Sequence, residues 1–180
     1  IEGNSGDCVR YVSYSFGDPV ILGFGILPEN PVDFAVVAPD DPLALGCVDR
    51  LHALGIKCFG PNAAAARIEA SKVFAKDLMK KYNIPTAAYE VFDDAERALD
   101  YVKRCLLPTV VKADGLALGK GVTICFSREE AEAAVESIML DRKFGDSGSQ
   151  IVVEEFLTGP EVSVLSFTDG KTVVPMVSSM

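Results

Sequence analysis

The stretch from Val110 to Val122 constrains the fold of this chain more than any other. Two β-branched residues lead into Lys112, a loop spaced by three glycines follows, and Val122-Thr123-Ile124-Cys125 resumes a strand pattern. Short runs of β-branched residues on both sides of a glycine-rich segment are typical of two antiparallel strands. The stretch therefore predicts a hairpin with a long, mobile tip.

The composition of this loop also indicates what it could bind. Glycines let a backbone approach a ligand closely and expose N–H groups that attract anions. Lys112 and Lys120 add two positive charges aimed at the same volume, which suits a polyphosphate. The loop has neither the residue order of a Walker A motif nor the glycine spacing of a dinucleotide fingerprint. The alternative is a flexible hairpin with solvated lysines.

Composition and charge exclude several classes of protein. The chain has 180 residues, 49% of them apolar, which is enough for one domain with a core or for two small lobes. A net charge of −9 argues against a nucleic-acid partner. No apolar run reaches membrane-spanning length, and the first residues lack a signal-peptide pattern. The five cysteines form no CxxC pair, so we expect reduced thiols and a cytoplasmic protein.

Residues 33–60 have the pattern of a parallel βαβ unit. A short buried strand is expected over 33–39, a helix from Asp41 to Leu54, and a second strand over 56–59. Gly55 ends the expected helix. The only histidine, His52, lies outside the apolar stripe, so we interpret it as an exposed helix residue and not as a catalyst or ligand.

Two helices are expected next, the second capped by Ser71 and running to Tyr82. Lys76 on this helix is interpreted as part of a solvated basic stripe. Lys72 differs, because it stands at the helix start, where the helix dipole disfavours a cation. An anionic ligand held by the dipole and Lys72 together would remove that conflict.

Residues 85–155 alternate as a β-α-β-β-α-β lobe. The pairs Asp93–Glu96 and Ser127–Glu130 have capping-box spacing and predict the starts of its two helices. A half-buried strand is expected over 161–167, followed by a turn at Asp169-Gly170 and a returning strand over 171–177. The fold class is thus α/β with α+β lobes.

Several of these motifs together resemble the ATP-grasp enzymes, and within them the phosphoribosylamine–glycine ligase family. The motifs are Ser71-Lys72-x-Phe74-Ala75-Lys76, Ile84-Pro85-Thr86-Ala87, the loop from Val111 to Val122, Phe144-Gly145, and Glu154-Glu155-Phe156-Leu157-x-Gly159-x-Glu161-x-Ser163. Phe59-Gly60-Pro61 and Asp169-Gly170-Lys171 point to the same family.

The resemblance implies a domain arrangement. Residues 1–60 would complete a parallel N-terminal domain, 61–84 would be connecting helices of the ATP-grasp core, 85–155 the lid lobe, and 156–180 the start of the catalytic antiparallel sheet. The family's magnesium ligands, and most of its substrate contacts, would lie beyond Met180. The chain therefore resembles a central fragment, inactive alone, whose exposed sheet edge predicts self-association.

The resemblance also implies residue roles. Lys72 and Lys112 would hold the ATP phosphates and act in catalysis, and the loop from Asp114 to Gly121 would close as a lid. Glu154, Phe156 and Leu157 would bind adenine, and Glu161 the ribose, although ordinary charge at a strand end also explains Glu154 and Glu161. The implied ATP residues are Lys72, Lys112, Asp114, Gly115, Gly119, Lys120, Gly121, Glu154, Phe156, Leu157 and Glu161.

The implied reaction is ATP- and magnesium-dependent ligation of glycine to 5-phosphoribosylamine through a glycyl phosphate, a step of purine biosynthesis. Its partners would be small molecules only, with no nucleic acid and no membrane. Two other interpretations stay open: a different ATP-grasp carboxylate–amine ligase, and a non-catalytic nucleotide-binding module.

Overall fold

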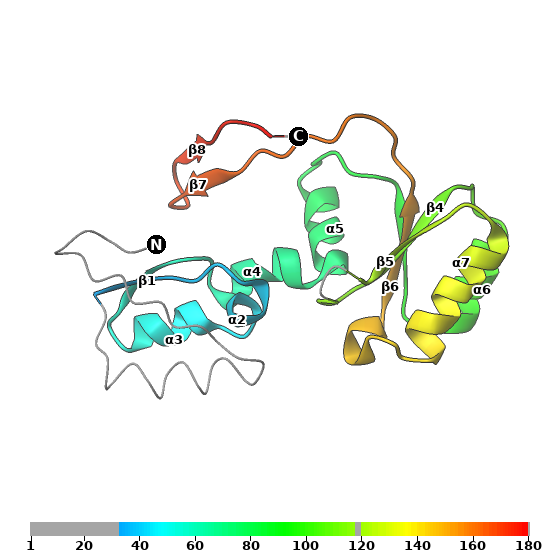
Figure 1. The fold of residues 1–180 in the computed structure, drawn as a ribbon, viewed down its shortest axis with the longest axis horizontal. Coiled ribbons are helices and arrows are strands. Elements are labelled where there is room, and N and C mark those ends of the chain that lie inside the picture. Colours follow the sequence, from blue (N-terminus) through cyan, green and yellow to red (C-terminus); the bar gives the residue numbers. More distant parts are fainter. Residues whose placement is uncertain (1–32, 118–119, 180) are drawn as a thin grey trace, which may run out of the picture.

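The computed structural model describes residues 33–117 and 120–179 (Figure 1). Their strands form a two-stranded parallel sheet, a four-stranded antiparallel sheet and a separate hairpin, so the expected mixture of parallel and antiparallel lobes is confirmed. The expectations for residues 1–32 and for Gly119 lie outside the described residues. Within the described ranges, no helix is long and apolar enough to cross a membrane.

The parallel sheet confirms the predicted βαβ unit but corrects its details. Strands β1 (Phe34–Val36) and β2 (Lys57–Phe59) pair in parallel. The single helix expected between them is wrong: α2 (Asp40–Ala44) and α3 (Cys47–Ala53) are separated at Gly46, whose φ of 81° breaks the helix. The strand expected to be buried is also more open, with Phe34 56% and Val36 67% exposed.

Helices α4 (Ala63–Ala70) and α5 (Lys72–Lys81) follow, joined at Ser71. Ser71 has an extended backbone, with φ −138° and ψ 115°, so the chain changes direction there instead of continuing as one helix. Its side chain accepts the N–H of Phe74, which confirms the predicted cap of α5.

The four-stranded sheet is built in the predicted β-α-β-β-α-β order. Its strands are β3 (Tyr89–Phe92), β4 (Thr109–Ala113), β5 (Val122–Cys125) and β6 (Ile151–Glu155), in the spatial order β3-β6-β4-β5. Helix α6 (Ala95–Val102) connects β3 to β4, and α7 (Arg128–Val135) follows β5. The π-helix η1 (Glu136–Leu140) and the 3-10 helix η2 (Gly145–Gly148) then lead into β6. The predicted hairpin is the antiparallel pair of β4 and β5.

The caps of α6 and α7 test the two capping-box predictions. The Ser127–Glu130 box is confirmed, with the serine side chain and the glutamate side chain each bonded to the other residue's backbone. At α6 the cap is Asp94, one residue later than expected, and its carboxylate accepts the N–H of Arg97. The capping box predicted for Asp93 and Glu96 is therefore wrong, because Asp94 caps the helix and the residue three positions later is Arg97.

The sheet has a helical layer on each face (Figure 1). Helices α6 and α7 cover one face, and α5 lies against the other. Because side chains alternate along a strand, Val111 and Ala113 of β4 and Ile151 and Val153 of β6 point into the core shared with α6 and α7. The intervening residues of both strands therefore point toward α5.

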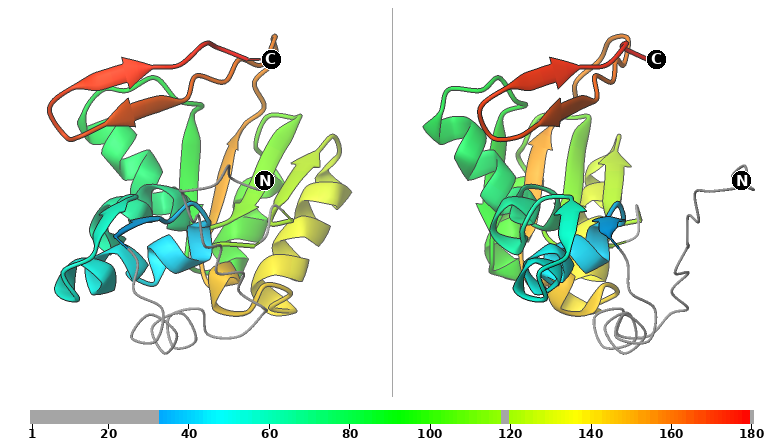
Figure 2. Two further views of the ribbon diagram at one scale, coloured as in Figure 1. Left: turned by 60° about the vertical axis from the view of Figure 1, so that its left-hand side comes forward. Right: turned by 90° about the vertical axis from the view of Figure 1, so that its left-hand side faces the viewer.

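The last strands lie apart from this sheet (Figure 2). After β6 the chain returns to the unit that contains β1 and β2, here called the N-terminal unit. There β7 (Ser166–Thr168) and β8 (Val173–Pro175) form a hairpin, and the ring centroid of Phe167 lies 5.6 Å from that of Phe59. The turn predicted at Asp169-Gly170 is confirmed. The longer half-buried strand expected over 161–167 is wrong, because only 166–168 pair in β7 and they are exposed.

The unequal burial of residues in this sheet predicts unequal costs for the same substitution on β6 and on β5. Ile151 on β6 is fully buried against α6 and α7, whereas the side chain of Ile124 on β5 is 45% exposed. We expect Ile151→Ala to lower the free energy of unfolding by about 2–5 kcal/mol, and the control Ile124→Ala to cost about 1 kcal/mol or less. Urea unfolding measures both variants, and equal losses would contradict the assignment of the core face.

Candidate functional site

The face of the sheet that meets α5 carries a group of charges. In the register of β4 and β6, Lys112 lies opposite Val152 and Glu154 lies opposite Val110, so Lys112 and Glu154 are diagonal neighbours on one face. Helix α5 brings Lys76 to the same place. The alternation that builds the core therefore also assembles this cluster.

Glu154 is the centre of the cluster. Its side chain is 6% exposed, and it pairs with both Lys76 and Lys112. The Nζ atom of Lys76 lies 2.5 Å from Oε2 of Glu154 and also donates to the hydroxyl of Thr86 at 2.8 Å. A buried carboxylate needs such partners, because burial removes the water that would otherwise stabilise its charge.

Burial affects the two lysines in the same direction. It lowers the pKa of Lys76 and that of Lys112, and the positive charges of Lys76 and Lys72 lower the pKa of Lys112 further. For Lys112 the net direction is downward although Glu154 lies against its ammonium group. Burial is the larger cause, and the smaller part, from Lys76 and Lys72, shows that the three ammonium groups repel one another; a bound anion would offset that repulsion.

A cavity of about 290 Å³ opens beside this cluster. Lys72, Lys76 and Lys112 line it together with Glu69 and Glu154, so three ammonium groups face two carboxylates. Among the described residues, Oε2 of Glu154 has no hydrogen-bond partner beyond its ion pair with Lys76. The cavity is thus lined by more ammonium groups than carboxylates, and Oε2 of Glu154 is buried against Lys76.

A second cavity, of about 470 Å³, lies on the loop side of Lys72. Lys72 and Glu69 line both cavities, and the second is completed by Asp40 and Asp41 and by Leu116, Ala117, Gly121 and Val122 of the loop region. The predicted lysine and the predicted glycine loop therefore do meet. The acidic pair at the start of α2 faces the same space.

The start of the loop is fixed to α5. The main-chain N–H of Lys72 donates to the carbonyl of Asp114 at 3.0 Å, and its Nζ lies 3.4 Å from the carbonyl of Gly115. The Asp114 carboxylate accepts the N–H of Val73 at 2.7 Å and the hydroxyl of Ser71 at 3.0 Å. The anion that the sequence requires at this helix start is thus present as a side chain of the chain itself.

The remaining predicted residues lie elsewhere. Lys120 is exposed, and Gly119 lies outside the described residues. Phe156, Leu157 and Glu161 come after β6, and none of them lines either cavity. Leu157 is 63% exposed, and the ring of Phe156 packs 6.0 Å from that of Phe126, between centroids.

Lys76 is the residue whose place the sequence analysis misjudged. It was expected on a solvated stripe, but its side chain is 12% exposed and bound to Glu154. Its spacing of four residues from Lys72 was a usable signal, because residues four apart share one helix face.

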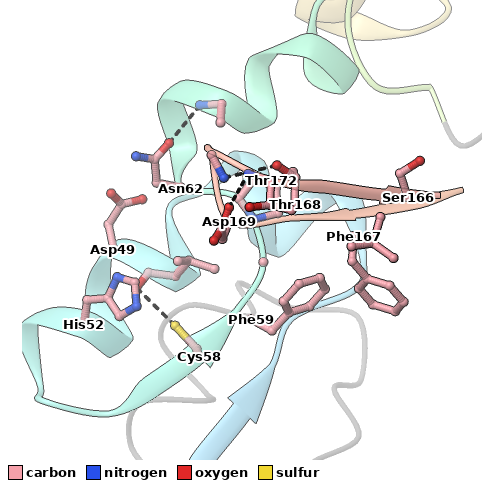
Figure 3. A pocket seen from close by; sticks show the side chains of 16 residues that line it. Asp49, His52, Cys58, Phe59, Asn62, Ser166, Phe167, Thr168, Asp169 and Thr172 are labelled. Atoms are coloured by element: carbon pink, nitrogen blue, oxygen red, sulfur yellow. Dashed lines mark hydrogen bonds between the residues drawn. The ribbon is translucent and has the colours of Figure 1, made fainter.

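A further cavity, of about 1180 Å³, lies between the N-terminal unit and the β7–β8 hairpin (Figure 3). Asp49, His52 and Asn62 point toward it from one side, and Asp169 and Thr172 come from the hairpin on the other. The residues that line it include no lysine or arginine. This cavity is therefore poorly suited to a polyphosphate.

The same fold occurs in solved ATP-grasp enzymes. A biotin carboxylase from Campylobacter jejuni superposes with a TM-score of 0.71 at 20% identity, covering 88% of this chain and 36% of that one. A phosphoribosylamine–glycine ligase from Thermotoga maritima superposes with a TM-score of 0.73 at 36% identity, covering 87% of this chain and 38% of that one. The fold is thus that of an ATP-grasp protein.

Sequence comparison identifies the family. The family model described as the phosphoribosylglycinamide synthetase ATP-grasp (A) domain matches residues 70–180, and the one described as the N domain matches residues 23–69. A phosphoribosylamine–glycine ligase from Clostridium acetobutylicum is 48% identical over 151 residues, which are 84% of this chain and 36% of that protein. The chain belongs to the phosphoribosylglycinamide synthetase family and spans about a third of the length of such relatives.

The paired charges predict a stability difference between two successive glutamates. We expect Glu154→Gln to lower the free energy of unfolding by about 1–3 kcal/mol, because two partly buried ammonium groups lose their counter-ion. The control Glu155→Gln changes an exposed side chain and should cost about 0.5 kcal/mol or less. Urea unfolding at neutral pH makes the comparison, and equal effects would show that the ion pairs contribute nothing to stability.

Proposed function

We propose that this chain carries the ATP-binding part of a phosphoribosylamine–glycine ligase. The observation that supports this most strongly is the convergence of Lys72, Lys76 and Lys112 on one cavity beside a glycine loop. Two elements far apart in the sequence supply these lysines, α5 and β4, and a solvated basic stripe would not require that convergence. Membership of the phosphoribosylglycinamide synthetase family also supports ATP binding by this part of the chain.

The proposed roles follow from the geometry of the cluster. Lys72 and Lys112 hold the phosphates and act in catalysis, and Lys76 joins them because it shares their cavity. The loop from Asp114 to Gly121 acts as a lid: Asp114 and Gly115 form its fixed base, and the part with Gly119, Lys120 and Gly121 closes over the phosphates. Glu154 contacts the adenine in this proposal, since it lines the same cavity as the three lysines.

The segment after β6 completes the proposed nucleotide site. Phe156 and Leu157 contact the adenine ring and Glu161 accepts the ribose hydroxyls in this proposal. All three follow directly on the strand that carries Glu154, and Leu157 and Glu161 are exposed, so nothing in the described residues encloses them. A bound nucleotide would bury Leu157 and give Glu161 hydrogen-bond donors.

The proposed reaction has two steps. The γ-phosphoryl group of ATP passes to the carboxylate of glycine, which gives ADP and glycyl phosphate. The amine of 5-phosphoribosylamine then attacks the acyl carbon, forms the amide bond and expels phosphate. No protein nucleophile takes part, so the lysines act by positioning the phosphates and by offsetting the charge that develops during transfer.

Magnesium belongs to this proposal only as a property of the family. The described residues contain no group of three acidic, histidine or cysteine side chains that could hold a metal ion. We therefore assign magnesium no ligand in this part of the chain and derive no step from it. The same proposal gives small molecules as the substrates and the cytoplasm as the location of the enzyme. It also includes self-association through the exposed β7–β8 hairpin.

The choice of reaction is tested by ADP release from the full-length protein. We expect release that requires both glycine and 5-phosphoribosylamine, because the acyl phosphate turns over only when the amine consumes it. Release with another acid and amine would instead identify a different carboxylate–amine ligase. ATP binding with no release under any of these conditions would identify a non-catalytic nucleotide-binding module.

The nucleotide site is tested separately by binding to the chain itself. We expect Lys112→Ala to weaken ATP binding about 10- to 100-fold, the effect of losing one charge-assisted contact. Lys80→Ala is the matched control, since Lys80 is exposed on α5 and lines neither cavity. Displacement of a fluorescent ATP analogue gives the dissociation constants. Unchanged affinity for Lys112→Ala would contradict the assignment.

A further inference from the structure

The amino end of α5 has its first backbone donors satisfied by the chain itself. The N–H of Lys72 donates to the main-chain carbonyl of Asp114, and the N–H of Val73 donates to its carboxylate. The N–H of Phe74 donates to Ser71 Oγ, whose hydroxyl in turn donates to Asp114 at 3.0 and 3.2 Å. A helix leaves its first N–H groups without internal partners, and here Ser71 and the distant residue Asp114 satisfy them together.

Asp114 occupies a special place in the chain. It directly follows β4 and is two residues from Lys112, while the helix it caps carries Lys72 and Lys76. It lies 43 positions from Ser71 in sequence, so its bonds are tertiary contacts and not local capping. The lysines of the cavity therefore come from two elements that Asp114 fastens together.

The segment that contains Asp114 is also held from its other side. The N–H of Asp114 donates to the main-chain carbonyl of Gln150, and the N–H of Gly115 donates to the main-chain carbonyl of Ser147. The hydroxyl of Ser147 donates to the carbonyl of Leu116 at 2.9 Å. A Cβ on Gly115 would lie 2.5 Å from the Ser147 hydroxyl oxygen, so only glycine fits this approach. The start of the loop is thus fixed between α5 and η2.

We propose that Asp114 is the positioning residue of the phosphate site: its carboxylate caps α5 and holds Lys72 and Lys76 against Lys112. This inference rests on the proposed nucleotide function and deepens it. Asp114 lines neither cavity, and both of its carboxylate oxygens accept bonds from Ser71 or Val73. It acts through the lysines and the loop, and it does not itself contact the nucleotide.

The test compares ATP with adenosine as ligands of the chain. Asp114→Ala removes the carboxylate that accepts from Val73 and Ser71, so we expect the dissociation constant of ATP to rise roughly 10- to 100-fold. The dissociation constant of adenosine, which has no phosphate, should stay within about twofold of the wild-type value. Asp114→Asn keeps a side-chain oxygen for the N–H of Val73, and asparagine caps helices about as well as aspartate, so ATP affinity should return to within about threefold of wild type.

A matched control separates positioning from general destabilisation. Asp94 caps α6 through the N–H of Arg97, in the same lobe and away from both cavities. Asp94→Ala should lower the melting temperature as Asp114→Ala does, without changing ATP affinity. Equal losses of ATP affinity in these two variants would overturn the inference. So would an Asp114→Asn variant as impaired as Asp114→Ala, because that result would show that the negative charge of Asp114, and not its hydrogen bond to α5, is what ATP binding needs.

A second measurement keeps this inference distinct from the proposed function. Amide hydrogen exchange at Lys72 and Val73 reports the cap directly and needs no ligand. We expect faster exchange at Val73 in Asp114→Ala, because its acceptor is the carboxylate, with a smaller change at Lys72, whose acceptor is the retained main-chain carbonyl, and unchanged exchange at both amides in Asp94→Ala. Unchanged protection in Asp114→Ala would overturn the positioning role. If the wild-type chain bound no ATP, the proposed function would fail, while the exchange result would still decide whether Asp114 holds α5.

Discussion

The buried carboxylate of Glu154 is the interaction on which the rest of the site depends. Three lysines around one cavity repel one another, and burial raises the cost of each charge. Glu154 offsets part of that repulsion by pairing with Lys76 from α5 and Lys112 from β4. Its charge therefore allows a helix and a strand, each carrying lysine, to pack face to face. The remaining positive charge would stabilise a bound anion.

The same sheet serves stability and chemistry because its two faces carry different residues. In β6, Ile151 and Val153 are buried against α6 and α7, while Glu154 points toward α5. A one-residue shift in the register of β6 would exchange these faces, burying the carboxylate in the apolar core. The apolar face thus fixes the register, and the register places Glu154 beside Lys112.

The sequence predicted features whose causes lie within a few residues. The β4–β5 hairpin, the Ser127–Glu130 capping box and the cap at Ser71 all depend on local spacing, and all three are present. Features whose deciding partner is distant in the sequence were not predicted. Lys76 was expected in solvent because Glu154, 78 positions later in the numbering, carries no local sign of pairing with it. The helix break at Gly46 was overlooked because the apolar stripe continues across it.

The unfavourable placement of Lys72 at a helix start was nevertheless informative. A cation there opposes the helix dipole, so the sequence implied an anion that it did not identify. The structure supplies a carboxylate from the end of β4, in the chain itself. Such a conflict between a residue and its local structure signals a distant partner. Here the partner also fixes where the glycine loop begins, so the compensation for one misplaced charge orients the part of the chain that we propose to close over ATP.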